Sequence, residues 1–94
     1  MPYTLVRIRF EEYEKWKTVF TEASPLRKSY GSKGVRVFRN ANEPDEVLIL
    51  GEYEDLEKAR QLFQSPEFRA ATQRAGVFGA PDVKYLDETA HLPA

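Results

Sequence analysis

Hydrophobic residues recur along the chain at two different spacings, and these spacings divide it into segments. Residues 3–10, YTLVRIRF, are rich in β-branched and aromatic types, which is typical of a β-strand. Residues 35–41, 46–54 and 82–88 have the same character, and a turn over residues 42–45 makes the first two of these an antiparallel hairpin. The pattern therefore predicts four strands.

The stretches between these strands switch to helical spacing. In residues 11–23 an apolar residue recurs every three or four positions, and glutamates occupy the first turn, where the helix dipole favours negative charge. Asp55 is a predicted N-cap for a second helix of the same kind. The two apolar stripes consist of Tyr13, Trp16, Val19, Phe20 and Ala23 in the first helix and of Leu56, Ala59, Leu62 and Phe63 in the second.

A Ser-Pro pair follows each helix. Serine as N-cap and proline as the first helical residue predict that a shorter helix begins at Ser24-Pro25 and another at Ser65-Pro66. Gly31 and Gly76 follow at the position where glycine commonly ends a helix. We expect residues 77–81, VFGAP, to form a loop before the last strand.

Both halves of the chain follow one order of strand, helix, Ser-Pro pair, short helix, glycine and strand. Two such split units predict a ferredoxin-like fold of βαββαβ order. We therefore expect an α+β protein with a four-stranded antiparallel sheet and the helices on one face. The 94 residues suffice for one domain, which we assign to residues 1–88, followed by a loose C-terminal tail over residues 89–94.

Alternation along the predicted strands separates two sheet faces. One is apolar enough to lie under the helices and holds Val6, Ile8, Phe10, Val35, Val37, Val47, Ile49, Tyr53, Val83 and Tyr85. The other mixes large apolar residues with charges and holds Leu5, Arg7, Arg9, Arg36, Phe38, Leu48, Leu50, Glu52, Lys84 and Leu86. Such an open patch usually marks an interaction site, so we expect a two-fold homodimer through the sheet faces. A monomer that leaves the mixed face open is the alternative.

Composition narrows the classes of partner. The 14 basic and 15 acidic residues are mixed along the chain, and without a basic stripe we expect neither nucleic acid nor an anionic membrane as a partner. The absence of cysteine excludes disulfides, thiol catalysis and thiolate metal sites, and it fits a reducing compartment. The first residues lack an apolar run long enough for a signal peptide or a membrane span, so we expect a cytoplasmic protein.

Short motifs lie where the predicted elements begin and end. They are Tyr13-x-x-Trp16-Lys17-x-x-Phe20, Gly31-Ser32-x-Gly34 followed by Val37-Phe38-Arg39, Asp55-Leu56-Glu57-Lys58-Ala59, Ser65-Pro66-Glu67 and Ala75-Gly76-Val77. With them, the chain resembles the dimeric α/β-barrel superfamily, near its small antibiotic-biosynthesis-monooxygenase-like proteins, over roughly residues 3–88. The resemblance implies a pocket between the sheet and the helices of each subunit. Cofactor-free members of that family oxidise polycyclic phenols to quinones, and relatives cleave haem.

The chain departs from that family at its functional residues. The quinone-forming members use an asparagine with two tryptophans, whereas this chain has one tryptophan and carries its asparagines, Asn40 and Asn42, at the hairpin turn. The haem-cleaving relatives need a helix-borne histidine, and the one histidine here, His91, lies in the tail. The resemblance therefore predicts the fold and leaves the reaction open.

The aromatic residues of the first helix and the strand ends are candidates for lining such a pocket. The indole of Trp16 could stack on a flat ligand, although aromatic residues at helical spacing more often belong to the core. Arg39 could clamp a carboxylate or phenolate at the pocket mouth, or pair with Glu46 or Glu54. The full set of pocket candidates is Tyr13, Trp16, Phe20, Arg39, Tyr53 and Tyr85.

Two functions remain open. One is a small cofactor-independent monooxygenase-like or cyclase-like enzyme that acts on an aromatic or polyketide-type molecule. The other is a non-catalytic dimeric module that binds a small ligand or stabilises a larger assembly. The sequence identifies no catalytic residue, and the lone histidine and the lack of cysteine and nucleotide motifs predict that no metal, haem or flavin is required.

Overall fold

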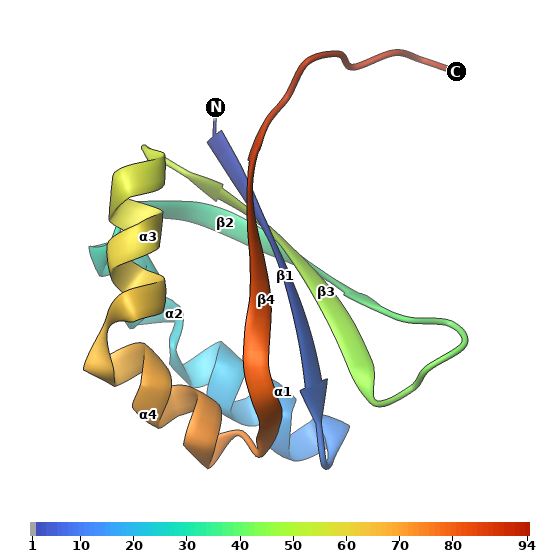
Figure 1. The fold of residues 1–94 in the computed structure, drawn as a ribbon, viewed down its shortest axis with the longest axis vertical. Coiled ribbons are helices and arrows are strands. Elements are labelled where there is room, and N and C mark those ends of the chain that lie inside the picture. Colours follow the sequence, from blue (N-terminus) through green and yellow to red (C-terminus); the bar gives the residue numbers. More distant parts are fainter. Residues whose placement is uncertain (1) are drawn as a thin grey trace.

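The computed structural model describes residues 2–94, which form a sheet with helices packed on one of its faces (Figure 1). The elements in chain order are β1 (Pro2–Phe10), α1 (Tyr13–Glu22), α2 (Ser24–Ser29), β2 (Ser32–Arg39), β3 (Glu46–Tyr53), α3 (Leu56–Gln64), α4 (Pro66–Arg74) and β4 (Val77–Asp87). The 4 strands lie in the order β2-β3-β1-β4, and each neighbouring pair is antiparallel. The predicted ferredoxin-like α+β fold is confirmed.

The two Ser-Pro pairs have different structures. Ser65 is extended and caps α4, because its hydroxyl accepts a hydrogen bond of 3.1 Å from the backbone N–H of Phe68. Ser24 instead lies inside α2, so the prediction that it is an N-cap is wrong. Here α1 passes into α2 with little interruption, since the N–H of Arg27 donates to the carbonyl of Ala23 at 3.1 Å. Proline is tolerated in this first turn because an N–H there has no helical partner to lose.

Glycines end both short helices, as expected. Gly31 directly follows the C-cap of α2 with a φ of 84°, and Gly76 follows that of α4 with a φ of 73°. Both lie in the left-handed region, which glycine enters without the steric cost that a Cβ would add. The chain can therefore turn back sharply into β2 and β4.

Two strand boundaries differ from the expected ones. β2 begins at Ser32 rather than at Val35, and β4 begins at Val77, so the prediction that residues 77–81 form a loop is wrong. The register between β1 and β4 shifts between Arg7 and Arg9, opposite this segment. A bulge in an edge strand accommodates glycine and proline that would interrupt a central strand.

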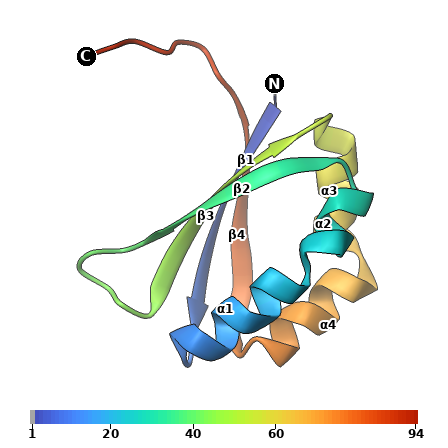
Figure 2. The same cartoon turned by 180° about the vertical axis from the view of Figure 1, so that it is seen from behind.

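The core lies between the sheet and the helices, and the predicted alternation in β3 is confirmed. Val47, Ile49 and Tyr53 are buried beneath the helices, while Leu48 and Leu50 on the other face are half-buried. The most deeply buried large side chains are Trp16, Tyr53, Phe10, Leu62, Val47 and Thr4. The hairpin of β2 and β3 extends beyond the helical layer (Figure 2). Val37 therefore stays 38% exposed although it belongs to the helix-facing set.

The C-terminal segment after Asp87 leaves the sheet and has no regular secondary structure. Within residues 2–94, no helix is both long enough and apolar enough to cross a membrane.

Candidate functional site

A cavity of about 60 Å³ lies between the helices and the sheet, and its surface is almost wholly apolar. Residues of all 4 strands and of all 4 helices line it. The aromatic side chains in its wall are Trp16, Phe20, Tyr53, Phe63 and Phe68. The cavity is thus an apolar, aromatic-walled space of the kind that small apolar molecules enter.

The wall on the side of α1 is a stack of rings. Trp16 and Phe20 are one helical turn apart, so they lie on the same face, with ring centroids 4.8 Å apart and an interplanar angle of 20°. On its other side Trp16 stacks on Phe10 of β1 at 5.6 Å. Trp16 is only 2% exposed. Trp16 therefore belongs both to the hydrophobic core and to the cavity wall.

The structure brings three of the six candidate residues to this cavity. Trp16, Phe20 and Tyr53 line it, whereas Tyr13, Tyr85 and Arg39 do not. Arg39 stacks its guanidinium on the Tyr13 ring, with 4.4 Å between the Cζ atom and the ring centroid. Its Nε donates to the carbonyl of Pro44 at 2.8 Å. Within residues 2–94, the ion-pair partners of Glu46 and Glu54 are Arg7, Arg9 and Lys58 rather than Arg39.

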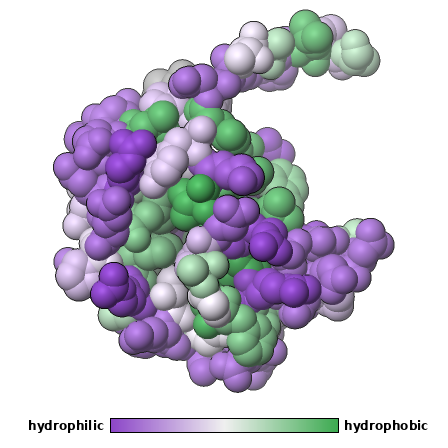
Figure 3. Space-filling view, viewed as in Figure 1, coloured by the Kyte–Doolittle hydropathy of each residue, from purple (hydrophilic) through white to green (hydrophobic). Residues whose placement is uncertain are grey.

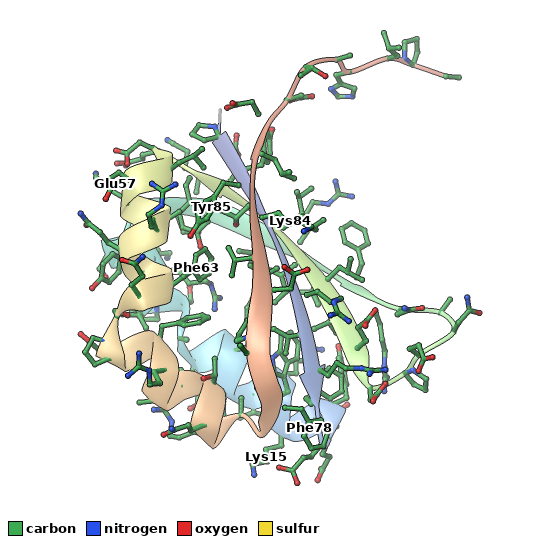
Figure 4. All side chains as sticks on the ribbon, viewed as in Figure 1. Lys15, Glu57, Phe63, Phe78, Lys84 and Tyr85 are labelled. Atoms are coloured by element: carbon green, nitrogen blue, oxygen red, sulfur yellow. The ribbon has the colours of Figure 1, made fainter. Side chains whose placement is uncertain are left out.

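Tyr85 lies on the helix-facing side of β4, outside the cavity. Its ring meets the edge of Phe63 at a centroid distance of 6.4 Å and has the guanidinium of Arg60 4.7 Å above it. Figure 4 shows Phe63 and Tyr85 together between α3 and the sheet, with Lys84 pointing away on the opposite face. Tyr85 thus packs between α3 and the sheet and does not line the cavity.

Arg27 is a lining residue that the sequence analysis missed. Its Nη1 donates to the backbone carbonyl of Phe20 at 2.6 Å, and its guanidinium lies 4.0 Å from the centroid of the Phe20 ring. Partial burial lowers the pKa of Arg27. The missed signal is its spacing, because Phe20, Ala23 and Arg27 continue the apolar stripe of α1 at three- and four-residue intervals.

Tyr53 is the other ionisable residue in the cavity wall. Burial raises the pKa of Tyr53 to about 12, although the nearby Arg27 charge acts in the opposite direction. Its hydroxyl is therefore neutral at physiological pH and has a proton that it can donate to a ligand. Gly51 leaves room for the ring, since a Cβ there would lie 2.9 Å from Cε1 of Tyr53 and 3.0 Å from Oγ1 of Thr4.

A surface groove of about 300 Å³ adjoins the cavity, between the helices α3 and α4 and the bulged start of β4. Hydrophobic side chains reach the surface between the helical layer and β4 (Figure 3). Four side chains belong to the walls of both spaces, namely Phe63, Phe68, Thr72 and Val77. The first two meet edge to face, with ring centroids 5.2 Å apart. A layer of these side chains therefore separates the groove from the cavity.

The outer face of the sheet is a second surface of interest. Its apolar residues lie in register, with Leu5 opposite Leu50 and Phe38 opposite Leu48. Phe38 is 47% exposed, and Phe78, which pairs with Arg9, is 54% exposed.

At one end of this face Glu46 is buried. It accepts hydrogen bonds from Nδ2 of Asn40 at 2.8 Å and from Nη1 of Arg7 at 3.1 Å. These contacts lower the pKa of the Glu46 carboxyl, the Asn40 hydrogen bond most of all. The charged residues of the outer face are thus partly satisfied within one chain, whereas its leucines and phenylalanines are not fully covered.

Residues 2–94 hold no cluster of three or more histidine, aspartate or glutamate side chains placed to bind a metal ion. His91, in the tail, has its Nδ1 3.6 Å from Oε1 of Glu88 and is largely exposed. It does not line the cavity.

The sequence model of one family, described as antibiotic biosynthesis monooxygenase, matches residues 4–74. The chain belongs to this family. The match runs from β1 to the end of α4, so it includes most residues of the cavity wall. No protein of curated function matches the chain.

Solved structures of the antibiotic biosynthesis monooxygenase family have the same fold. A Bordetella bronchiseptica protein provisionally described as an antibiotic biosynthesis monooxygenase is 16% identical, with a TM-score of 0.80 over 95% of this chain and 97% of that one. SnoaB of Streptomyces nogalater, a cofactor-independent oxygenase, is 12% identical, with a TM-score of 0.78 over 99% and 97%. A Caulobacter crescentus protein, provisionally described in the same way, is 18% identical, with a TM-score of 0.73 over 95% and 90%. At these identities the likeness concerns the fold.

Proposed function

We propose that the protein binds a small aromatic molecule between its helices and its sheet and oxidises it with molecular oxygen, without a bound cofactor. The observation that carries this proposal is the apolar cavity walled by the stacked rings of Trp16 and Phe20. Membership of the antibiotic biosynthesis monooxygenase family supports the reaction class, and SnoaB, which shares the fold, is a cofactor-independent oxygenase.

Binding requires the cavity to open. An apolar protein cavity of about 150 Å³ takes up one benzene molecule, and the present cavity has about 60 Å³. Rotation of Phe63 and Phe68 would join it to the groove of about 300 Å³. The combined space falls in the range of roughly 300–1,000 Å³ that is usual for small-molecule sites. We therefore expect a flat ligand to enter beside β4 and to stack on the rings of α1.

Oxidation without a cofactor suits a substrate whose own electrons reduce O₂. In the oxidation of a polycyclic phenol or its keto tautomer, a ring CH₂ group becomes a carbonyl and O₂ is the oxidant. One oxygen atom ends on the ring carbon, and the other leaves as water with the two hydrogens of that carbon. In this scheme the apolar wall excludes bulk water, and the neutral Tyr53 hydroxyl donates a hydrogen bond to the substrate oxygen.

Anthrone is a suitable probe, because its oxidation to anthraquinone consumes one O₂ and releases one water. We expect the protein to accelerate oxygen uptake, measured with an oxygen electrode, and to form anthraquinone in equal amount. Phe20→Ala removes a ring of the cavity wall and should slow the reaction. Phe38→Ala, which removes a ring from the outer face, is the matched control and should not. Anthrone that binds but is consumed no faster than in buffer would contradict the catalytic proposal.

The second candidate function is non-catalytic binding of the same class of molecule. In the part of the chain that the structure describes, Arg27 and Tyr53 are the only ionisable residues of the cavity wall, and neither is a base near neutral pH. This observation favours a binding module, because a general base must have a pKa close to the working pH. Saturable binding of anthrone without oxygen uptake would identify this function.

We also propose that the protein is a homodimer whose outer sheet faces pack together. Leu5, Leu48, Leu50 and the exposed Phe38 form an apolar patch that a partner copy would cover. Symmetric packing of identical faces is the commonest closed assembly. The test is the Leu48→Asp variant described in the Discussion.

A further inference from the structure

We propose that Arg27 makes the cavity selective for aromatic ligands that carry a negatively charged oxygen, a phenolate or a carboxylate, and that it positions this oxygen beside the Tyr53 hydroxyl. The inference rests on the proposed binding of an aromatic ligand between the helices and the sheet. It adds the chemical class of that ligand and the residue that recognises it.

Within residues 2–94, Arg27 is the only cationic residue of the cavity wall. Among residues 2–94, no carboxylate lies within ion-pair distance of its guanidinium, whereas Arg7, Arg9 and Arg60 all have acidic partners. Arg27 is half-buried, so its charge is only partly withdrawn from water, and a ligand that covered it further would have to supply a negative partner. The wall therefore holds a positive charge that lacks its counter-charge.

The guanidinium is held in a fixed plane. Its Nη1 donates to the Phe20 carbonyl, and its face packs on the Phe20 ring. The hydrogen bond alone would also suit a purely structural role, since the Arg27 side chain from α2 bonds a carbonyl in the last turn of α1. That role uses one of five N–H donors. The others are available to bind an oxygen in a bidentate manner.

Tyr53 supplies a second donor close by. Tyr53 lines the same cavity as Arg27, and the Arg27 charge acts on its hydroxyl. A neutral phenol and a guanidinium that converge on one space match an anionic oxygen, which accepts several hydrogen bonds. An aromatic ring attached to that oxygen would lie along Trp16 and Phe20.

The test compares 2-naphthoate, which is anionic at neutral pH, with the neutral isostere 2-naphthamide by isothermal titration calorimetry. We expect naphthoate to bind at least about tenfold more tightly, in keeping with a hydrogen bond to a charged group. Arg27→Gln should abolish this preference and leave naphthamide affinity within about threefold. Arg60→Gln is the matched control, because Arg60, like Arg27, stacks on an aromatic ring but lies outside the cavity wall. It should change neither affinity.

A second measurement needs no variant and tests the phenolate source of the same charge. The absorbance of bound 1-naphthol should show the naphtholate band at a pH where free naphthol is still protonated, since Arg27 favours the ionised form. A merely structural arginine would not shift this band.

The outcomes separate this inference from the proposed function. Equal affinities of the wild type for naphthoate and naphthamide, a preference that survives in Arg27→Gln, or bound naphthol that stays protonated would overturn the role of Arg27 and leave aromatic binding intact. Failure of all three compounds to bind would overturn both. Circular dichroism establishes that Arg27→Gln is folded, and the wild-type measurements decide the matter if it is not.

Discussion

The two faces of the sheet are made from the same strands but have different roles. On the helix side Val47 is 0% exposed and Val6 is 3% exposed, so their apolar surface is covered within one chain. On the outer face the neighbouring residue Leu48 is only half-buried, and Phe38 is 47% exposed among arginines. A single step along a strand thus separates residues that stabilise the fold from residues available for association.

The largest effect should come from the inner face. Trp16→Ala removes a ring packed between Phe10 and Phe20, and we expect a loss of about 3–5 kcal/mol in the free energy of unfolding. Phe38→Ala, the control on the outer face, should cost about 0.5 kcal/mol or less in the dilute monomer. Urea unfolding followed by far-UV circular dichroism at low concentration measures both. Similar losses in the two variants would show that the faces do not differ as described.

The second effect concerns association through the outer face. Leu48→Asp places an unpaired charge in the proposed dimer interface, which by the usual cost of such burial weakens the dimer by several kcal/mol. Light scattering at micromolar concentration should give about twice the chain mass of 10.9 kDa for the wild type and the chain mass itself for the variant. Val37→Asp, an exposed position on the other face, should leave the dimer intact. A monomeric wild type would contradict the proposal.

A smaller effect should appear in acid at the outer face, where the Glu46 carboxylate is buried. Hydrogen bonds from Asn40 and Arg7 lower the pKa of Glu46 below its ordinary value of 4.5. A lowered carboxyl pKa stabilises the fold above the ordinary value, and this stabilisation is lost as the pH falls through the lowered one.

The Glu46→Gln variant lacks this titration. The stability advantage of the wild type over Glu46→Gln should therefore be complete above the ordinary pKa of 4.5 and be lost as the pH falls through the lowered pKa, as measured by thermal unfolding over a pH series. We expect a modest change, because Arg7 and Arg9 are half-exposed and salt screens them. Parallel curves for the two proteins would show that Glu46 does not contribute.

The smallest effect should show that residues of the inner face differ in how deeply they are buried. Val37→Thr, at a site beyond the cover of the helices, should change stability by no more than about 0.5 kcal/mol. Val47→Thr, at a fully buried site, leaves a hydroxyl without a partner and should cost about 1–3 kcal/mol. Urea unfolding of this matched pair measures the difference. Equal costs would mean that the hairpin is packed more closely than its exposure indicates.

Much of the fold follows from local pattern. Alternation assigned Val47 and Leu48 to opposite faces, and Asp55 caps α3 as predicted, with its carboxylate 2.8 Å from the N–H of Lys58. The errors arose where tertiary context overrides local preference. Glycine and proline in residues 77–81 indicated a loop, but an edge strand tolerates both at a bulge. At Ser24 the helix continues, because proline in a first turn loses no hydrogen bond.

The candidate site was predictable only where helical spacing reveals it. Trp16 and Phe20 follow from the stripe of α1, whereas Arg27 was missed because Pro25 suggested that the stripe had ended. Strand alternation gave the correct side for Arg39 and Tyr85 but not their distance from the cavity. That distance depends on how far the helices extend over each strand, and no local pattern encodes it.

The strand order also decides when the sheet can be completed. β1 lies inside the sheet, yet one of its neighbours is β4, so that Pro2 pairs with Asp87. During synthesis the edge of β1 that β4 later covers stays open until almost the whole of residues 2–87 has left the ribosome. An open strand edge readily pairs with other chains. The nascent protein is therefore most exposed to aggregation just before β4 arrives, and the pairing of its first and last strands acts as the closing step of folding.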